Sequence, residues 1–415
     1  MASIRRRSLF VILYLVMLLI ILEGASYIVV AKLYDNSLGN QSERHLYSSI
    51  RGHQLNPTYR RVGDTENTRI HSSQGFRRDE LVILEKPSDT IRIIMLGGST
   101  LYGIGVQQDD IYPTHRTLFN NETVPFFLQK LLQDHFSPDE SLKFEVINAG
   151  VVAYHTFHHV LYFYETLHEY DPDLLLFLDG HNDFYNMGVK NPIKEYPYSS
   201  ARMIDALNDR RIFFSIYMLA RYFGDYSYFS KLVEKATKRL FESYETSAHK
   251  VTGNNAVPDG DLDKALADSA RVGFLRNYRI IEAFARYHDF EFHVFLQPEI
   301  VFENRMELSE SDRSISSITE ELYGQDRVNL MKEVRNRLPE LFSANGIPFT
   351  DISSIGTDGK GDSLYIDYAH LTPHGSEVVA GRMFSIVKEM ARQRLARRDE
   401  SVRAVQPAGV SIRRQ

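Results

Sequence analysis

Short apolar runs, each followed by a segment with helical periodicity, constrain the fold of this chain more than any other feature. The first three runs are DTIRIIML, LKFEVINAG and PDLLLFLDG, at residues 89–96, 142–150 and 172–180. Their nearly continuous aliphatic character is typical of strands that are buried on both faces of a parallel sheet. Residues 124–136 and 155–170, which lie between them, carry apolar residues at helical spacing. This alternation predicts a parallel sheet that is covered by helices.

The alternation resumes after a long interruption. Residues 184–260 are rich in Tyr and Phe, show helical periodicity and are predicted to form a helical insertion. Beyond it we expect helix, strand, helix, strand and helix in turn, at residues 262–288, 290–298, 327–346, 347–353 and 375–398. The predicted fold class is α/β: a three-layer α/β/α domain with a five-stranded parallel sheet, spanning residues 89–395 and containing the insertion.

The N-terminus predicts contact with a membrane. After three arginines, residues 9–31 are largely apolar, and as a helix these 23 residues would be about 35 Å long, enough to cross a bilayer. Glu23 interrupts the stretch, so a cleaved signal peptide followed by secretion is the alternative. The apolar YIVVA beyond Glu23 favours a retained transmembrane signal-anchor within residues 1–35. Arg5, Arg6 and Arg7 place the N-terminus in the cytoplasm, so the remaining chain is predicted to be periplasmic or extracellular.

The amino-acid composition excludes some classes of binding partner and of catalytic chemistry. The 415 residues include no cysteine, which excludes thiol catalysis, thiolate metal sites and disulfides. A net charge of -6 without a long basic block predicts no nucleic-acid partner. Residues 36–88 are polar and are expected to form a stalk that leads into the domain, and residues 396–415 a disordered tail. The oligomeric state cannot be predicted from this sequence.

Ser99 is the first candidate for a reactive side chain. It comes three residues after Leu96, and Gly97 and Gly98 allow a tight turn between the predicted strand and the next helix. In a parallel α/β sheet, ligands bind at the carboxyl ends of the strands. The N–H groups of the following helix N-terminus can stabilise a developing oxyanion there. A serine that merely caps a helix is the alternative interpretation.

Three further polar stretches would lie at the same edge of the sheet. They are NAGVVAYHT, DGHND and DYAHLTPHG, at residues 148–156, 179–183 and 367–375. Asp367 and His370 are three residues apart, so that a turn can bring carboxylate and imidazole together, and His370 could act as general base toward Ser99. Asn182 offers a neutral amide donor for an oxyanion. Taken singly, each stretch could be an ordinary polar turn or surface pair.

In this order the stretches resemble the four blocks of the SGNH/GDSL hydrolase superfamily, which carry Ser, Gly, Asn and His. The resemblance implies a flavodoxin-like α/β/α fold, an acyl-serine mechanism and no cofactor. It implies that Ser99 is the nucleophile, that Asp367 and His370 complete a triad, and that Asn182 and the Ser99 N–H belong to the oxyanion hole. Gly98 and Thr100 depart from the family, which usually has Asp and Leu at these positions.

The Gly block is an imperfect match. Where the family often has Asn-x-Gly-x-x-Gly, this chain has Gly150 at the first glycine and Ala153 at the second. A further oxyanion donor is therefore expected from the backbone of Gly150 or Ala153, the latter if its φ is negative. The letters GDSL also occur literally at residues 361–364, but no apolar strand precedes them. We therefore expect Ser363 to be an ordinary residue of a Gly- and Asp-rich turn.

Other functions remain open at this point. His155, His158 and His159 cluster, and His370 and His374 are four apart, which allows a metal site as an alternative. The spacing of His155 and His159 is more typical of surface residues of a helix.

The predicted function is a serine esterase that hydrolyses an O-acyl ester, acetyl in the first place, with an acylated cell-surface glycan as a candidate substrate. An O-acyltransferase that acts on surface polysaccharide, which would share the acyl-serine intermediate, and an inactive glycan-binding scaffold are the alternatives.

Overall fold

The structure of the chain is a computed structural model. It describes residues 2–29, 44–48, 50–59, 70–105, 117–137, 141–183, 227–233, 273–356 and 362–405. Two compact units emerge, one comprising residues 1–71 and 194–259 and the other residues 72–193 and 260–415. The predicted insertion at 184–260 lies outside the described residues except for 227–233, and so does the predicted boundary between anchor and stalk at residue 35.

The second unit is built on a five-stranded sheet in the order β4-β3-β5-β6-β7. The strands are β3 (Thr90–Gly97), β4 (Lys143–Asn148), β5 (Leu174–Asp179), β6 (Glu291–Leu296) and β7 (Phe349–Asp351). Every neighbouring pair is parallel. The predicted five-stranded parallel sheet is confirmed, and its order is the flavodoxin-like 2-1-3-4-5. In this order the first strand, β3, lies at the point where the winding reverses, between β4 and β5.

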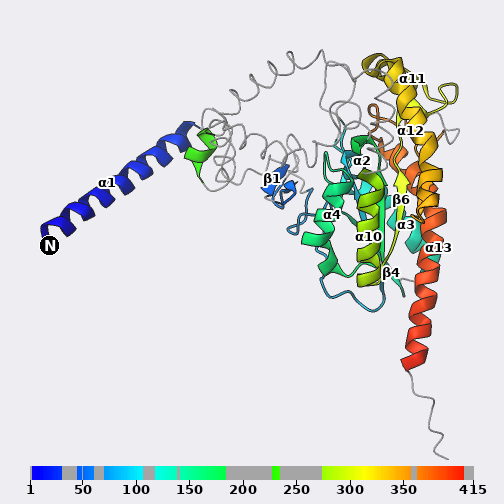
Figure 1. The fold of residues 1–415 in the computed structure, drawn as a ribbon, viewed down its shortest axis with the longest axis horizontal. Helices are drawn as coiled ribbons and strands as arrows, with labels where there is room; N and C mark the ends of the chain where they lie inside the picture. Colours follow the sequence, from blue (N-terminus) through cyan, green and yellow to red (C-terminus); the bar gives the residue numbers. More distant parts are fainter. Residues whose placement is uncertain are drawn as a thin grey trace, which may run out of the picture. The chain divides into compact units, whose positions relative to one another are not determined.

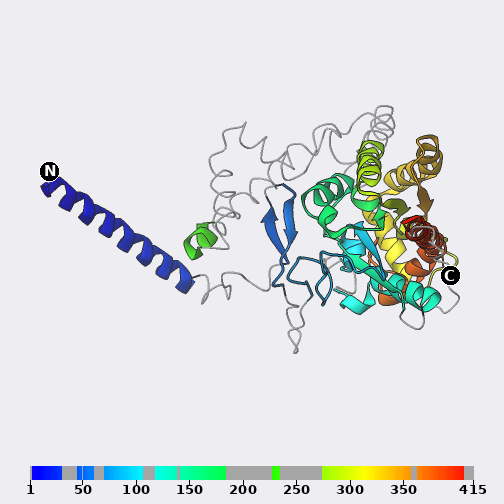
Figure 2. The ribbon, with the colours of Figure 1, turned by 90° about the horizontal axis from the view of Figure 1, so that it is seen from below.

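Helices cover both faces of the sheet (Figures 1 and 2). On one face α3 (Val124–Phe136) packs against α13 (Pro373–Val405), and on the other α4 (Thr156–Glu165) packs against α10 (Leu275–His288). Alternate residues of the strands fill the two interfaces, because successive side chains of a strand point to opposite faces. Ile93 and Leu176 belong to the core on the α3 and α13 face. The Phe177 ring lies edge-on to the Tyr278 ring of α10, with centroids 5.2 Å apart.

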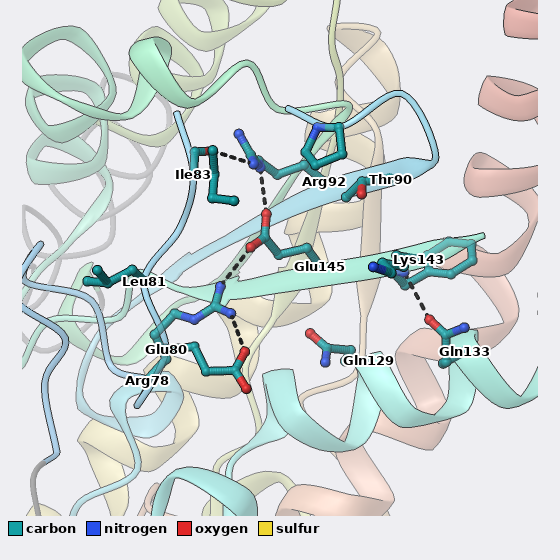
Figure 3. A pocket seen from close by; sticks show the side chains of 12 residues that line it. Arg78, Glu80, Leu81, Ile83, Thr90, Arg92, Gln129, Gln133, Lys143 and Glu145 are labelled. Carbon is teal, nitrogen blue, oxygen red and sulfur yellow. Dashed lines mark hydrogen bonds and ion pairs between the residues drawn. The ribbon is translucent and has the colours of Figure 1, made fainter. Parts of the chain in front are cut away.

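The outer edge of the sheet is protected by side chains of α3. β4 is an edge strand, and the N–H groups of Phe144 and Val146 donate to Gln133 Oε1 at 3.0 Å and Gln129 Oε1 at 2.8 Å. Exposed strand edges otherwise invite pairing with other chains. A cavity of 540 Å³ lies beside this edge, at the start of β3 and β4, and there Glu145 binds both Arg78 and Arg92 (Figure 3).

Several elements differ from the sequence prediction. The expected stalk contains a two-stranded antiparallel hairpin of β1 (His45–Ser48) and β2 (Gly52–Leu55), and its last part, residues 72–88, belongs to the second unit. Helix α11 (Glu310–Tyr323), which precedes α12 (Gln325–Ala344), is not among the helices expected from the sequence. Helix α13 extends to Val405, past the expected domain end at 395, because residues 396–405 contain no proline or glycine that would stop a helix.

The apolar N-terminal stretch forms α1 (Ala2–Tyr27) in the first unit. Residues 10–27 have a mean hydropathy of 2.2, and the helix is long and apolar enough to cross a membrane. Glu23, the charge that interrupts this stretch, accepts hydrogen bonds from Ser227 Oγ at 2.8 Å, Tyr228 N at 2.5 Å and Phe229 N at 3.2 Å. These bonds satisfy the carboxylate and the first N–H groups of the helical segment that follows Ser227.

Candidate active site

Ser99 lies at the carboxyl end of β3, as the first residue of the short helix α2 (Ser99–Tyr102). Its Oγ is 2.6 Å from His370 Nε2, and His370 Nδ1 is 2.6 Å from Asp367 Oδ1 and 2.8 Å from Asp367 Oδ2. His370 and Asp367 are buried. The structure thus brings together three side chains that are separated by up to 271 positions in the sequence.

The loop before α13 holds the imidazole in place. Asp367 Oδ1 accepts hydrogen bonds from the N–H groups of Ala369 and His370, both at 3.1 Å, and the Ile366 N–H donates to the His370 carbonyl at 2.7 Å. One carboxylate therefore orders the loop backbone and orients the ring. Helix α13 begins at Pro373, two residues before the expected start at 375, and leaves His370 outside the helix.

Asn182 lies close to the nucleophile turn, by which we mean residues 97–99 with the candidate nucleophile Ser99. It follows β5, and its Nδ2 donates to the Tyr154 carbonyl at 2.6 Å. A Cβ atom added to Gly98 would lie only 2.5 Å from the same Nδ2. Glycine at position 98 thus leaves room for the Asn182 amide directly beside Ser99.

The turn after β4 differs from the expectation. The Gly150 N–H donates to Asn148 Oδ1 at 2.9 Å, so this donor is already used inside the turn. Ala153 has a φ of +64°, so the negative φ that was the condition for its donor role is not present, and the residue adopts the left-handed conformation that glycine adopts readily. The Val151 N–H donates to the Gly97 carbonyl at 3.1 Å and holds this turn against the nucleophile turn. No described residue accepts a hydrogen bond from the Ala153 N–H.

A buried polar network next to Asn182 was not expected from the sequence. Thr156 Oγ1 donates to Asp183 Oδ1 at 2.9 Å and accepts from Asn277 Nδ2 at 2.8 Å. Asp183 Oδ2 is buried and has no hydrogen-bond partner among the described residues. Burial, and then the charge of Asp179, raise the pKa of Asp183 well above its ordinary value. The Asp183–Thr156 bond connects the loop that carries Asn182 to the start of α4, next to Tyr154.

The histidines of the metal alternative have other partners. His155 and His159 are buried rather than on the surface as expected, because α4 packs its histidines inward. His159 Nε2 is 2.8 Å from Asp179 Oδ1, and the Tyr278 hydroxyl donates to Asp179 Oδ2 at 2.9 Å. His374 Nδ1 lies 4.0 Å from Glu377 Oε2 on α13. In the part of the chain that the structure describes, no group of three or more His, Asp or Glu side chains is arranged to hold a metal ion.

Ser363, the serine of the literal GDSL, has a local structural role. Its Oγ donates to Asp312 Oδ1 at 2.7 Å, and Asp312 also accepts from the N–H groups of Leu364 and Tyr365 at 3.0 and 3.1 Å. The Asp312 carboxylate is fully buried. Ser363 therefore holds its loop against α11 by a hydrogen bond. The serine that is hydrogen-bonded to the His370 imidazole is Ser99.

Comparisons with known proteins found matches among solved structures alone: no protein-family model and no curated protein matched the chain. An acetyl xylan esterase, AlAXEase, is 13% identical over 72% of this chain and 100% of its own, with a TM-score of 0.36. An acetylxylan esterase from Geobacillus stearothermophilus is 10% identical over 72% and 94%, with a TM-score of 0.34. A putative G-D-S-L family lipolytic protein from Desulfitobacterium hafniense is 11% identical over 71% and 98%, with a TM-score of 0.30.

Proposed function

We propose that this chain is a serine esterase with Ser99 as nucleophile. The observation that carries the proposal is the continuous hydrogen-bonded series Asp367–His370–Ser99 at the carboxyl end of β3. His370 Nε2 takes the proton of Ser99 Oγ as that oxygen attacks the ester carbonyl, and Asp367 stabilises the imidazolium. His370 then protonates the leaving alcohol, and an acyl-serine remains. A water molecule, activated by the same imidazole, releases the acid.

The oxyanion of the tetrahedral intermediate needs donors beside Ser99. We propose the N–H of Ser99 itself, Asn182 Nδ2 and the N–H of Ala153. Ala153 is included despite its positive φ because that conformation is the one a glycine at this position would readily adopt. Asn182 uses one amide proton for the Tyr154 carbonyl and keeps the second for the substrate. An amide suits this position because it donates without losing a proton. The Asp183–Thr156 bond would hold the Asn182 loop and the Ala153 turn at a fixed separation.

The proposed location is the outer face of a membrane, with α1 as a retained signal-anchor. The three hydrogen bonds to Glu23 support retention, because cleavage of the leader would leave the segment after Ser227 without its cap. At that surface we propose an O-acyl ester, acetyl first, on a cell-surface glycan as the substrate. Transfer of the acyl group to a sugar hydroxyl instead of water would use the same intermediate.

The test uses the full-length protein in detergent micelles and the acetate and butyrate esters of p-nitrophenol. We expect Ser99→Ala and His370→Ala to lower kcat by about 10⁴-fold or more. Ser363→Ala is the matched control and should turn over like the parent. Activity that survives Ser99→Ala and disappears with a chelator would replace this proposal by a metal-dependent hydrolysis. With a polysaccharide acceptor present, acetyl groups on the polysaccharide rather than free acetate would indicate a transferase.

A further inference from the structure

A second series of hydrogen bonds runs beside the proposed triad. Thr100 Oγ1 donates to the Ala369 carbonyl at 3.2 Å, and Gln297 Nε2 donates to Thr100 Oγ1 at 3.0 Å. All three residues are buried. The hydroxyl donates one hydrogen bond and accepts the other, as a threonine can.

Two residues of this series are direct sequence neighbours of two members of the proposed triad. Thr100 directly follows Ser99, and Ala369 directly precedes His370. Gln297 follows β6, and its N–H donates to the Asp179 carbonyl at the end of β5 at 2.7 Å. The Thr100 hydroxyl therefore connects the nucleophile turn to the imidazole loop, which is the loop of residues 366–370 before α13. Gln297 holds that hydroxyl in place relative to the sheet.

We propose that Thr100 and Gln297 are positioning residues that set the distance between Ser99 Oγ and His370 Nε2; this inference rests on the proposed serine esterase function. The bonds of Asp367 to Ala369 and His370 all lie within the loop itself, so they orient the ring without fixing the loop to α2. The Thr100–Ala369 bond makes that connection. A displacement of about 1 Å between reacting groups can cost about a hundredfold in rate.

The chemistry of position 100 supports the inference. An apolar side chain at this position could form neither of the two hydrogen bonds. In this chain the Ala369 carbonyl and the Gln297 amide depend on the Thr100 hydroxyl, because buried polar groups without partners are unfavourable. Threonine at 100 and glutamine at 297 are therefore expected to act as a pair.

The test compares Thr100→Val, Thr100→Ser and Gln297→Leu in the full-length protein in micelles. Thr319→Val is the matched control, because Thr319 Oγ1 is buried and donates to the Ile315 carbonyl of its own helix at 2.8 Å. Three quantities are measured for each variant: kcat and KM with p-nitrophenyl acetate, the rate at which a fluorophosphonate labels Ser99, and the melting temperature. The labelling rate reports the nucleophilicity of Ser99 independently of turnover.

We expect Thr100→Val to lower kcat and the labelling rate by about ten- to a hundredfold, with KM changed by less than about twofold. Thr100→Ser should restore both rates. Gln297→Leu should also lower kcat. The double variant Thr100→Val/Gln297→Leu should be no slower than Thr100→Val alone, because both substitutions break the same series of hydrogen bonds. Thr319→Val should lower the melting temperature without lowering kcat.

Any of three results would overturn the inference. They are a kcat of Thr100→Val that is no lower than that of Thr319→Val, a Thr100→Ser variant whose kcat and labelling rate are not restored, and a kcat of Gln297→Leu that equals the parent's. The last variant leaves the nucleophile turn unchanged, so it decides the question if Thr100→Val fails to fold. A parent protein whose Ser99 is neither labelled nor needed for turnover would instead refute the esterase proposal, and the positioning role with it.

Discussion

Replacing Gly98 with alanine tests how closely Asn182 approaches the nucleophile. The added Cβ atom would lie 2.5 Å from Asn182 Nδ2 and 3.2 Å from the Tyr154 carbonyl oxygen. Ordinary contact needs about 3.5 Å, so the amide must retreat by about 1 Å. Because Nδ2 is the end of a side chain that can rotate, we expect this donor to be displaced while the fold persists. Loss of one oxyanion donor lowers kcat by about 10²- to 10³-fold, and that is the loss expected for Gly98→Ala.

The assay is the hydrolysis of p-nitrophenyl acetate, with kcat and KM measured for Gly98→Ala, Asn182→Ala and the double variant. If the added methyl group acts by moving Asn182, the double variant should be no slower than Asn182→Ala alone. Gly381→Ala is the matched control, because a Cβ atom at that position of α13 meets nothing within 4 Å. A Gly98→Ala protein with the parent's kcat, in a series where Asn182→Ala is impaired, would refute the reasoning.

Three further predictions concern stability. Ala153→Gly should raise the free energy of unfolding in urea by about 0.5–1 kcal/mol, because glycine adopts the observed φ of +64° without strain; a decrease would contradict this. Burial lowers the pKa of His293 from 6.5 to about 4, so the folded protein binds fewer protons than the unfolded chain between these values. Stability should therefore fall as the pH drops from 6.5 toward 4, and His293→Gln should make that fall in melting temperature shallower. Gln133→Leu leaves the Phe144 N–H without its acceptor, which should cost about 1–3 kcal/mol and produce concentration-dependent association in size-exclusion chromatography. Gln393→Leu, at an exposed position of α13, is the control.

The centre of the sheet could be predicted from the sequence because β3 and β5 are buried along their whole length. Strands of this kind are largely apolar, and β5, which begins with five consecutive apolar residues, is the clearest case. Helix α11 gave no comparable signal, since few of its residues are apolar. Its start is marked instead by a polar cap, in which Ser309 Oγ accepts from the Asp312 N–H at 3.1 Å. A serine followed three residues later by an acidic residue is a helix-start signal that could have revealed it.

The candidate site was predictable only where chemistry and chain position coincide. Ser99, Asn182 and His370 each follow or precede a predictable element, and each has a side chain suited to one step of ester hydrolysis. The φ of Ala153 depends on how its turn meets Gly97, a contact between two strands that no local pattern encodes. Gln297 is likewise an ordinary polar residue after a strand until the fold places its amide on the Thr100 hydroxyl. Residues that react can be predicted from their type, whereas residues that position them are identified by the distances that the fold creates.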